Sequence, residues 1–214
     1  TIGQSSDPCT NCPPPVDSKL EATWGCVLSD QTQCSFTSQG DRIADTYWNS
    51  SAVDGYTLPY TMTVTDNTIT DQGSPCDNSD CSTLSFSQCP TSADLSQGFD
   101  GATFPADANL DMRVINASGA MIGCYSTCSV LTYPTFGGKG NADSSNEASL
   151  YCCPTPPISS EACRAGPVVN TEYVNRVHTL CNNSVYTYAY DDGLGLRHCS
   201  AGTKVHVSFG PNCP

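Results

Sequence analysis

VDGYTLPYTMTVT, residues 53–65, carries the clearest secondary-structure signal of the chain. From residue 60 onward, large side chains alternate with threonines: Tyr60, Met62 and Val64 against Thr61, Thr63 and Thr65. A period of two predicts a β-strand with one buried face. The Asp54-Gly55 pair ahead of it is typical of a turn. The stretch therefore predicts a turn that leads into an antiparallel strand.

Two later stretches show the same alternation. At residues 185–190, Val185, Thr187 and Ala189 alternate with tyrosines at 186, 188 and 190. At residues 204–209, Val205, Val207 and Phe209 alternate with polar residues. Gly, Asn and Asp separate these stretches, so we expect an all-β protein. The three tyrosines either stack on sugar rings or pack beneath a neighbouring part of the fold.

One helix is expected at residues 172–181. Thr171 can cap its N-terminus, where the helix dipole also favours the charge of Glu172. Val174 and Val177 would share one buried face with Cys181.

The cysteine content indicates an oxidising compartment. Fifteen of the 214 residues are cysteine, and a reducing cytosol would leave so many thiols as liabilities. Three sequons agree with a secreted glycoprotein and begin at Asn49, Asn116 and Asn182. Because fifteen is odd, seven bridges leave one thiol for another chain, for a missing segment or as a buried free cysteine. We expect a secreted protein, extracellular or in a cell wall.

Charge and hydrophobicity exclude other classes of function. The chain has 8 Lys+Arg against 21 Asp+Glu, a net charge of −13, whereas nucleic-acid binding requires clustered cations. No apolar run approaches the roughly 20 residues that span a bilayer, so no membrane insertion is expected. The first four residues, TIGQ, are no signal peptide, and we expect a mature, processed chain.

Metal and cofactor chemistry is not expected either. The Cys9-x-x-Cys12 pair has no second pair at zinc-finger spacing. His178, His198 and His206 are scattered and have no evident partner for a catalytic triad. We expect no cofactor and no metal.

The chain resembles the thaumatin-like proteins in a series of motifs that keep the family's order. They are Val53-Asp54-Gly55-Tyr56-Thr57-Leu58-Pro59, Cys76-x4-Cys81, Gln88-Cys89-Pro90, Cys124-x3-Cys128, Tyr151-Cys152-Cys153-Pro154, the Tyr173–Cys181 helix, Tyr188-Ala189-Tyr190-Asp191-Asp192, Cys199 and Cys213-Pro214. Each motif is weak alone. Their order argues against chance, because the cysteines from Cys76 onward follow the same order as in the family. Roughly residues 19–214 are covered, with insertions around 92–123, 134–149 and 154–167.

The resemblance implies a thaumatin-like β-sandwich, N-terminally incomplete, with a disulfide-rich lobe of loops and helices folded against it and a cleft between them. Residues 1–18 would be a Pro/Cys-rich arm. Residues 19–75 and 164–214 would form the sandwich part, and residues 76–163 the lobe.

The resemblance also implies five disulfides: Cys76–Cys199, Cys81–Cys181, Cys89–Cys124, Cys128–Cys152 and Cys153–Cys163. Cys26–Cys34 would be a local bridge of this protein's own. Cys9, Cys12 and Cys213 remain unassigned, three thiols for one bond.

The chain departs from the family at its N-terminal end. Family members begin with a long set of strands, whereas only 44 residues precede Asp45 here, and they contain a Pro-rich arm. A sandwich without those strands would expose unpaired edges, which proteins normally cover. We therefore expect a second polypeptide, or self-association, at the exposed sheet edge.

The family's acidic cleft, associated with β-1,3-glucans, can be carried over residue by residue. The cleft Glu falls on Glu21, and two Asp residues fall on Asn49 and Asp54, while a fourth carboxylate falls on Asp191 or Asp192. The cleft Arg has no counterpart. Glu21 and Asp54 could act as a general acid and its partner, because glycoside hydrolysis needs two carboxyls. Asn49 replaces one carboxylate, however, and a glycan there would occupy the groove.

These residues favour a non-catalytic function. We expect a binder of extracellular or cell-wall polysaccharide of β-1,3-glucan type, in defence or matrix. The alternatives are a structural subunit of an extracellular assembly or filament, one chain of a covalent heteromer, or an endo-β-1,3-glucanase.

Overall fold

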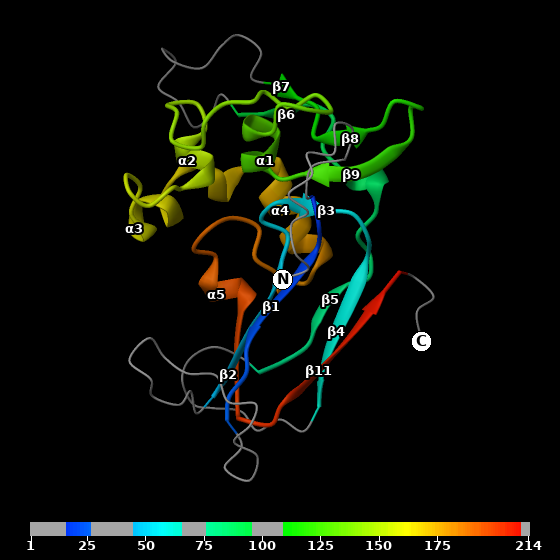
Figure 1. Ribbon diagram of the computed structural model, residues 1–214, viewed down its shortest axis with the longest axis vertical. Helices are drawn as coiled ribbons and strands as arrows, with labels where there is room; N and C mark the ends of the chain where they lie inside the picture. Colours follow the sequence, from blue (N-terminus) through cyan, green and yellow to red (C-terminus); the bar gives the residue numbers. More distant parts are fainter. Residues whose placement is uncertain (1–15, 27–44, 66–75, 96–108, 211–214) are drawn as a thin grey trace, which may run out of the picture.

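The computed structural model describes residues 16–26, 45–65, 76–95 and 109–210. Two three-stranded antiparallel sheets form its lower part in Figure 1, and a lobe of helices and short strands lies above them. The first sheet has the order β1 (Lys19–Thr23), β2 (Thr46–Ser51) and β10 (Leu196–Cys199). The second has the order β11 (Lys204–Phe209), β4 (Tyr60–Thr65) and β5 (Ser79–Cys81). The expected strand-rich sandwich is thus confirmed.

Strands β4 and β11 are the two alternating stretches at residues 60–65 and 204–209, and both predictions are confirmed. They pair antiparallel along their whole length, from Tyr60 opposite Phe209 to Thr65 opposite Lys204. The apolar set of each strand therefore lies on one face of the second sheet.

The two sheets face each other through that apolar face. Ser50 on β2 and Tyr60 on β4 share a hydrogen bond of 2.6 Å between Oγ and the phenol oxygen, and both are buried. Trp48, two residues before Ser50 on the same face of β2, is also buried, as is Met62 on β4. The core of the sandwich lies between these strands.

Within the described residues, a disulfide joins the two sheets on one side of the sandwich, and the other side is open. The Cys76–Cys199 disulfide joins the end of β10 to the segment before β5. On the open side lie β1 and β11, each of which pairs with one neighbour only among the described strands. Leu20, opposite Ser50, and Phe209, opposite Tyr60, have inward-facing side chains, yet they are 38% and 45% exposed.

The lobe consists of short elements. A sheet of order β3-β9-β8 contains β3 (Gly55–Tyr56), β9 (Met121–Tyr125) and β8 (Arg113–Ile115), while β6 (Ala93–Asp94) pairs with β7 (Asn109–Leu110). Short helices accompany these strands: η2 (Phe86–Gln88), α1 (Thr127–Thr132), α2 (Ser149–Cys152), α3 (Ser160–Arg164), η4 (Pro167–Asn170), α4 (Glu172–Leu180) and α5 (Asp192–Gly195). None of the helices in the described ranges is long and apolar enough to cross a membrane.

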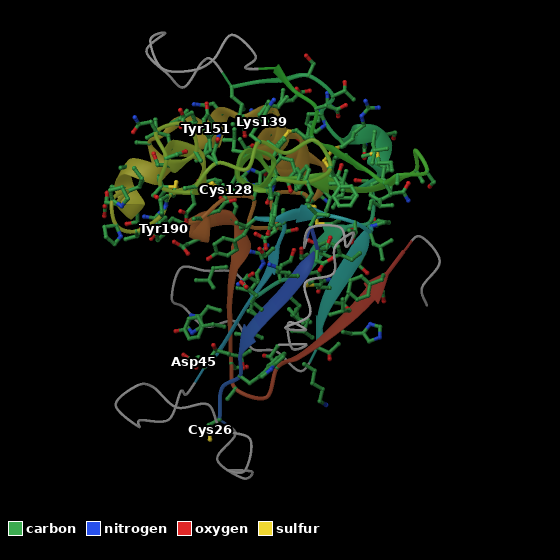
Figure 2. The ribbon with its side chains drawn as sticks, turned by 45° about the horizontal axis from the view of Figure 1, so that its top comes forward. Cys26, Asp45, Cys128, Lys139, Tyr151 and Tyr190 are labelled. Carbon is green, nitrogen blue, oxygen red and sulfur yellow. A yellow bond between two sulfur atoms is a disulfide. The ribbon has the colours of Figure 1, made fainter. Side chains whose placement is uncertain are left out.

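Five disulfides hold these parts together, and they are the five pairs that the family resemblance implies. They are Cys76–Cys199, Cys81–Cys181, Cys89–Cys124, Cys128–Cys152 and Cys153–Cys163. Figure 2 shows Cys128 inside the lobe and Cys26 at the opposite end of the molecule. Cys26 is disulfide-bonded. Its expected partner Cys34 lies outside the described residues, as do Cys9, Cys12 and Cys213.

The predicted helix at residues 172–181 is confirmed as α4. Thr171 caps it, accepting a hydrogen bond from the backbone N–H of Val174 at 3.4 Å. Val174, Val177 and Cys181 are buried as expected. The Tyr173 phenol donates to the Ala52 carbonyl oxygen at 2.6 Å, so the helix is anchored to the end of β2.

The strand expected at residues 185–190 was wrong. Only Tyr186 makes a β-bridge, to Ser51, and the chain then turns. The reason is local: the backbone N–H of Thr187 donates to the Asp191 carboxylate at 2.9 Å, and Tyr190 has a left-handed φ of 67°. The alternation still describes burial, because Val185 and Thr187 are buried while the tyrosines are half-buried.

Candidate functional site

A row of side chains crosses the outer face of the first sheet. Glu21 on β1 lies opposite Asn49 on β2, which lies opposite Leu196 on β10. Directly opposed residues of an antiparallel sheet project to the same face. Ser50 points into the core, so Asn49 and its two partners point outward. The Asn49 Nδ2 donates to Glu21 Oε2 at 3.3 Å, so these two predicted site residues are in contact.

Lys19 connects this row to Asp54. It lies two residues before Glu21 on the same face of β1, and its ammonium forms an ion pair with Asp54. Burial alone would lower the pKa of Lys19, but the hydrogen bond to Asp54 and the nearby charges of Asp54 and Glu21 raise it above its ordinary value. Burial, and then the charge of Asp54, raises the pKa of Tyr133, so the lobe approaches the sheet here.

Tyr186 stands at the other end of the row. The backbone N–H of Tyr186 donates to the Ser50 carbonyl oxygen at 2.9 Å, which fixes it beside β2. Its phenol donates to Asp192 Oδ1 at 2.5 Å, and Arg164 Nη2 donates to the other oxygen of Asp192 at 2.5 Å. Burial raises the pKa of Tyr186, and the hydrogen bond to Asp192 and the charges of Asp192, Asp191 and Glu21 raise it further. Tyr186 is therefore a neutral phenol in an acidic environment.

We call this surface the carboxylate face and define it by Lys19, Glu21, Asn49, Asp54, Tyr186 and Asp192. Two of its carboxylates have a cation as partner: Asp54 has Lys19, and Asp192 has Arg164. Both ion pairs are partly exposed, with side chains between 31% and 45% accessible. Glu21 is exposed and accepts the amide of Asn49.

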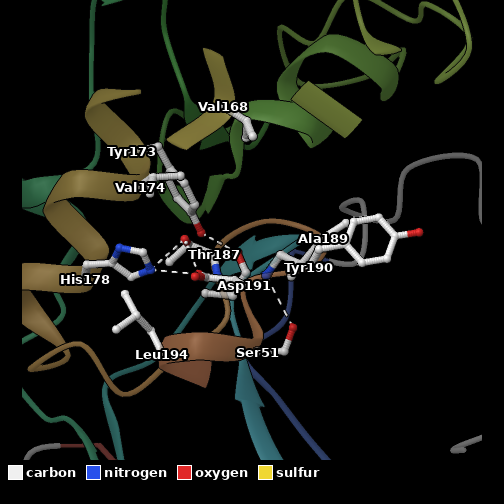
Figure 3. Close-up of polar contacts among 12 residues, drawn as sticks. Ser51, Val168, Tyr173, Val174, His178, Thr187, Ala189, Tyr190, Asp191 and Leu194 are labelled. Carbon is white, nitrogen blue, oxygen red and sulfur yellow. Dashed lines mark hydrogen bonds and ion pairs between the residues drawn. The ribbon is translucent and has the colours of Figure 1, made fainter. Parts of the chain in front are cut away.

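Asp191 belongs to a different, buried cluster, although it is the immediate neighbour of Asp192. Only 4% exposed, its Oδ2 accepts from Thr187 N at 2.9 Å, Thr187 Oγ1 at 2.9 Å and His178 Nε2 at 2.8 Å (Figure 3). Thr187 Oγ1 also lies 3.0 Å from the same His178 Nε2. A nucleophilic triad needs the carboxylate and the hydroxyl on opposite nitrogens of the imidazole. Both are on Nε2 here, so this arrangement is not a triad.

The sequence identified part of the carboxylate face. Glu21, Asn49, Asp54 and Asp192 are linked by the contacts above, whereas Asp191 faces away from them into the helix α4 cluster. Lys19 was missed, although its spacing of two from Glu21 on a strand would have placed it on the same face. Arg164 was also missed, because no local pattern relates it to Asp192, 28 residues away.

The three sequons lie in different settings. Asn49 is in the middle strand of the first sheet, with its Nδ2 engaged by Glu21 and its Oδ1 closed off from solvent. Asn116 lies in the β8–β9 connection, where its Oδ1 accepts from Ser118 Oγ at 2.7 Å. Asn182 is exposed, just after α4.

Metal binding finds no support in the described ranges. There, no group of three or more His, Cys, Asp or Glu side chains is placed to hold a metal ion.

A family model described as "Thaumatin family" matches residues 15–211. The chain therefore belongs to the thaumatin family, in agreement with its sandwich and disulfides. Over 165 residues, 77% of this chain, it is 25% identical to "Thaumatin-like protein 2" of Prunus persica and 26% identical to "Glucan endo-1,3-beta-glucosidase" of Prunus avium. It is 28% identical over the same length to "Thaumatin-like protein 1b" of Malus domestica. These matches cover 50%, 49% and 57% of the relatives, so the chain spans about half the length of the curated relatives it matches.

Proposed function

We propose that this protein is a secreted, non-catalytic binder of extracellular polysaccharide of the β-1,3-glucan type, and that the carboxylate face is its binding surface. The observation that carries the proposal is the placement of Tyr186, whose phenol is bonded to Asp192 and lies near the charge of Glu21. Carboxylates accept hydrogen bonds from sugar hydroxyls, and an aromatic ring packs against the apolar face of a sugar.

The ion pairs favour binding over hydrolysis. Glycoside hydrolysis needs one carboxyl that donates a proton and a second that acts as nucleophile or base. On the carboxylate face, Asp54 is paired with Lys19 and Asp192 with Arg164, and the position of a third carboxylate is occupied by Asn49. Glu21 is thus left beside an amide rather than beside a free carboxylate.

The test is depletion of the protein by insoluble linear β-1,3-glucan. We expect the wild type to be depleted, and Glu21→Gln to bind several-fold more weakly because it loses one charged acceptor. Lys204→Gln, an exposed change on the second sheet, is the matched control and should bind like the wild type. No depletion of the wild type, or equal depletion of the Glu21 variant, would contradict the proposal.

A second candidate is hydrolysis of β-1,3-glucan. One relative, from Prunus avium, carries the name glucan endo-1,3-beta-glucosidase, and Glu21 with Asp54 would then be the acid and its partner. New reducing ends from linear β-1,3-glucan, measured for the wild type and for Glu21→Gln, decide the question. Equal rates for the two proteins remove this candidate.

A third candidate is a structural one: the open side of the sandwich takes strands from a second polypeptide. The exposed inward-facing Leu20 and Phe209, on two strands with one neighbour each among those described, favour it. An occupant would be an extended segment with alternating apolar residues that pairs with β1 or β11. Intact mass with and without reductant, together with light scattering, tests this. A monomer with an unchanged mass apart from reduced disulfides speaks against it.

A further inference from the structure

A pocket of about 450 Å³ lies beside Asp191. Helix α4 contributes Val174 and His178 to its wall, and the segment leading to α5 contributes Tyr188, Tyr190 and Asp191. A volume of this size is within the range of small-molecule sites, which are mostly apolar with a few convergent polar groups. The pocket has that composition, because valine, leucine and tyrosine side chains line it together with three polar groups: the Asp191 carboxylate, the His178 imidazole and the Arg164 guanidinium.

The polar groups of the pocket are held in fixed orientation. The Asp191 carboxylate receives three hydrogen bonds on Oδ2, from both polar groups of Thr187 and from His178 (Figure 3). A carboxylate has about four acceptor positions. The Tyr188 phenol is a further donor to this carboxylate, so the protein itself fills its acceptor positions. When His178 Nε2 donates to Asp191, Nδ1 of the ring is an acceptor. The cluster therefore offers His178 Nδ1 and the Tyr188 phenol oxygen to the hydroxyl groups of a ligand.

Two tyrosines, Tyr188 and Tyr190, also line the pocket. Burial, and then the charge of Asp191, raises the pKa of Tyr188, whose neutral phenol donates to this carboxylate and leaves its oxygen as an acceptor. Tyr190 has a left-handed φ of 67°, which non-glycine residues rarely adopt. Its phenol lies 2.5 Å from Thr155 Oγ1, and Arg164 Nε donates to its backbone carbonyl at 2.9 Å. The strained residue is thus held from both ends, as is common where a site is preorganised.

The charges select the ligand. The Arg164 guanidinium lies 5.9 Å over the Tyr190 ring and is paired with Asp192, so the cation position at this ring is already filled. The carboxylate of Asp191 disfavours an anion. What remains is a neutral molecule that offers hydroxyls to His178 and to the Tyr188 phenol oxygen and an apolar face to Leu194.

We propose that this pocket is a second binding site, separate from the carboxylate face, for a single neutral hexose ring. The proposal does not depend on glucan binding, because the two sites share no lining side chain except through the Arg164–Asp192 pair.

The test uses methyl β-D-glucopyranoside as the probe and the chemical shifts of the His178 ring and of the Thr187 and Leu194 amides as the readout. We expect saturable shifts at these three residues with the neutral probe and much smaller ones with glucuronic acid and glucosamine. Tyr188→Phe removes one acceptor and should weaken binding by about fivefold, the value of one hydrogen bond.

Leu194→Trp fills the pocket and should abolish the shifts. Leu58→Trp makes the same change at an exposed leucine outside the pocket and should leave them intact. Glu21→Gln should also leave them intact, which separates this site from the carboxylate face. No saturable shift in the wild type, equal response to the charged sugars, or full binding by the Leu194 variant would overturn the proposal. If the Leu194 variant fails to fold, unchanged affinity of Tyr188→Phe would overturn it.

Discussion

Gly195 lies so close to Tyr186 that a Cβ on Gly195 would stand 2.0 Å from Cδ2 of the tyrosine ring. The absence of a side chain at Gly195 therefore lets Tyr186 reach Asp192. We expect Gly195→Ala to displace the ring and break its hydrogen bond to Asp192. Overpacking of this kind destabilises by about 1–3 kcal/mol. Both the fraction of protein that binds to β-1,3-glucan and the free energy of unfolding should therefore decrease in this variant.

Gly193→Ala is the matched control, because it lies in the same short helix and a Cβ there has no neighbouring atom within 4 Å. Chemical denaturation and glucan depletion measured on both variants check the prediction. If the two variants behave alike, the close approach of Gly195 to Tyr186 does not matter for the site.

The sequence predicted the regular parts of this fold because they follow simple periods. Strands β4 and β11 each place their apolar residues on one face, which is buried at Tyr60 and Met62 of β4, and helix α4 has a cap and an apolar stripe. Residues 185–190 have the alternation of a strand, but the Asp191 side chain takes the backbone N–H of Thr187 that a neighbouring strand would have needed. The alternation of side chains does not reveal that a nearby side chain will accept a backbone hydrogen bond in place of a neighbouring strand.

The carboxylate face was predictable only where a motif pointed to it. Glu21, Asn49 and Asp54 follow from the family pattern, whereas the choice between Asp191 and Asp192 required the fold. Adjacent residues at the start of a helix can point in opposite directions, and here one contacts His178 and the other Tyr186.

The disulfides should contribute to stability according to the loops that they close. Cys76 and Cys199 are 123 residues apart, and Cys153 and Cys163 are 10 apart. The Cys81–Cys181 bridge lies inside the longer loop, so with that bridge intact Cys76–Cys199 closes only the short segments 76–81 and 181–199. Chain-entropy arguments then give about 3.5 kcal/mol for Cys76–Cys199 and about 2.7 kcal/mol for Cys153–Cys163. We expect the Cys76→Ser/Cys199→Ser protein to lose about 1 kcal/mol more than Cys153→Ser/Cys163→Ser, as measured by urea unfolding. The reverse order would show that native packing, and not loop closure, dominates.

Buried tyrosines should make the protein sensitive to alkali. Burial raises the pKa of Tyr60 from 10.0 to about 12, against the smaller opposite effect of its hydrogen bond to Ser50. The unfolded chain releases this proton at a lower pH than the folded protein does. The free energy of unfolding is therefore unaffected by Tyr60 below pH 10 and falls as the pH rises toward the pKa of Tyr60 in the folded protein. Each such tyrosine lowers the free energy of unfolding by about 1.4 kcal/mol per pH unit in that window.

Tyr60→Phe checks this prediction. It should lower the free energy of unfolding at neutral pH, because the Ser50 hydroxyl loses its hydrogen-bond partner. Above pH 10, the free energy of unfolding should fall less steeply with pH, by the slope that corresponds to about one proton. Urea unfolding at a series of pH values, with phenolate absorbance followed in parallel, gives both quantities. An unchanged slope would mean that Tyr60 ionises in the folded protein as it does in the unfolded one.

The three sequons should differ in glycan occupancy when the protein is made in a secretory host. Asn49 lies in the middle strand of its sheet, where its Nδ2 donates to Glu21 and its Oδ1 is closed off from solvent, so a glycan there would have to break the contact with Glu21. Asn116 and Asn182 lie in connections, and Asn182 is exposed. We therefore expect glycans at Asn116 and Asn182 and an unmodified Asn49, as determined by mass spectrometry of glycopeptides. Asn49→Gln should then secrete with the same mass shift on deglycosylation as the wild type, whereas Asn116→Gln should lose one glycan. A glycan on Asn49 would cover Glu21 and contradict both the occupancy prediction and the use of the carboxylate face for polysaccharide binding.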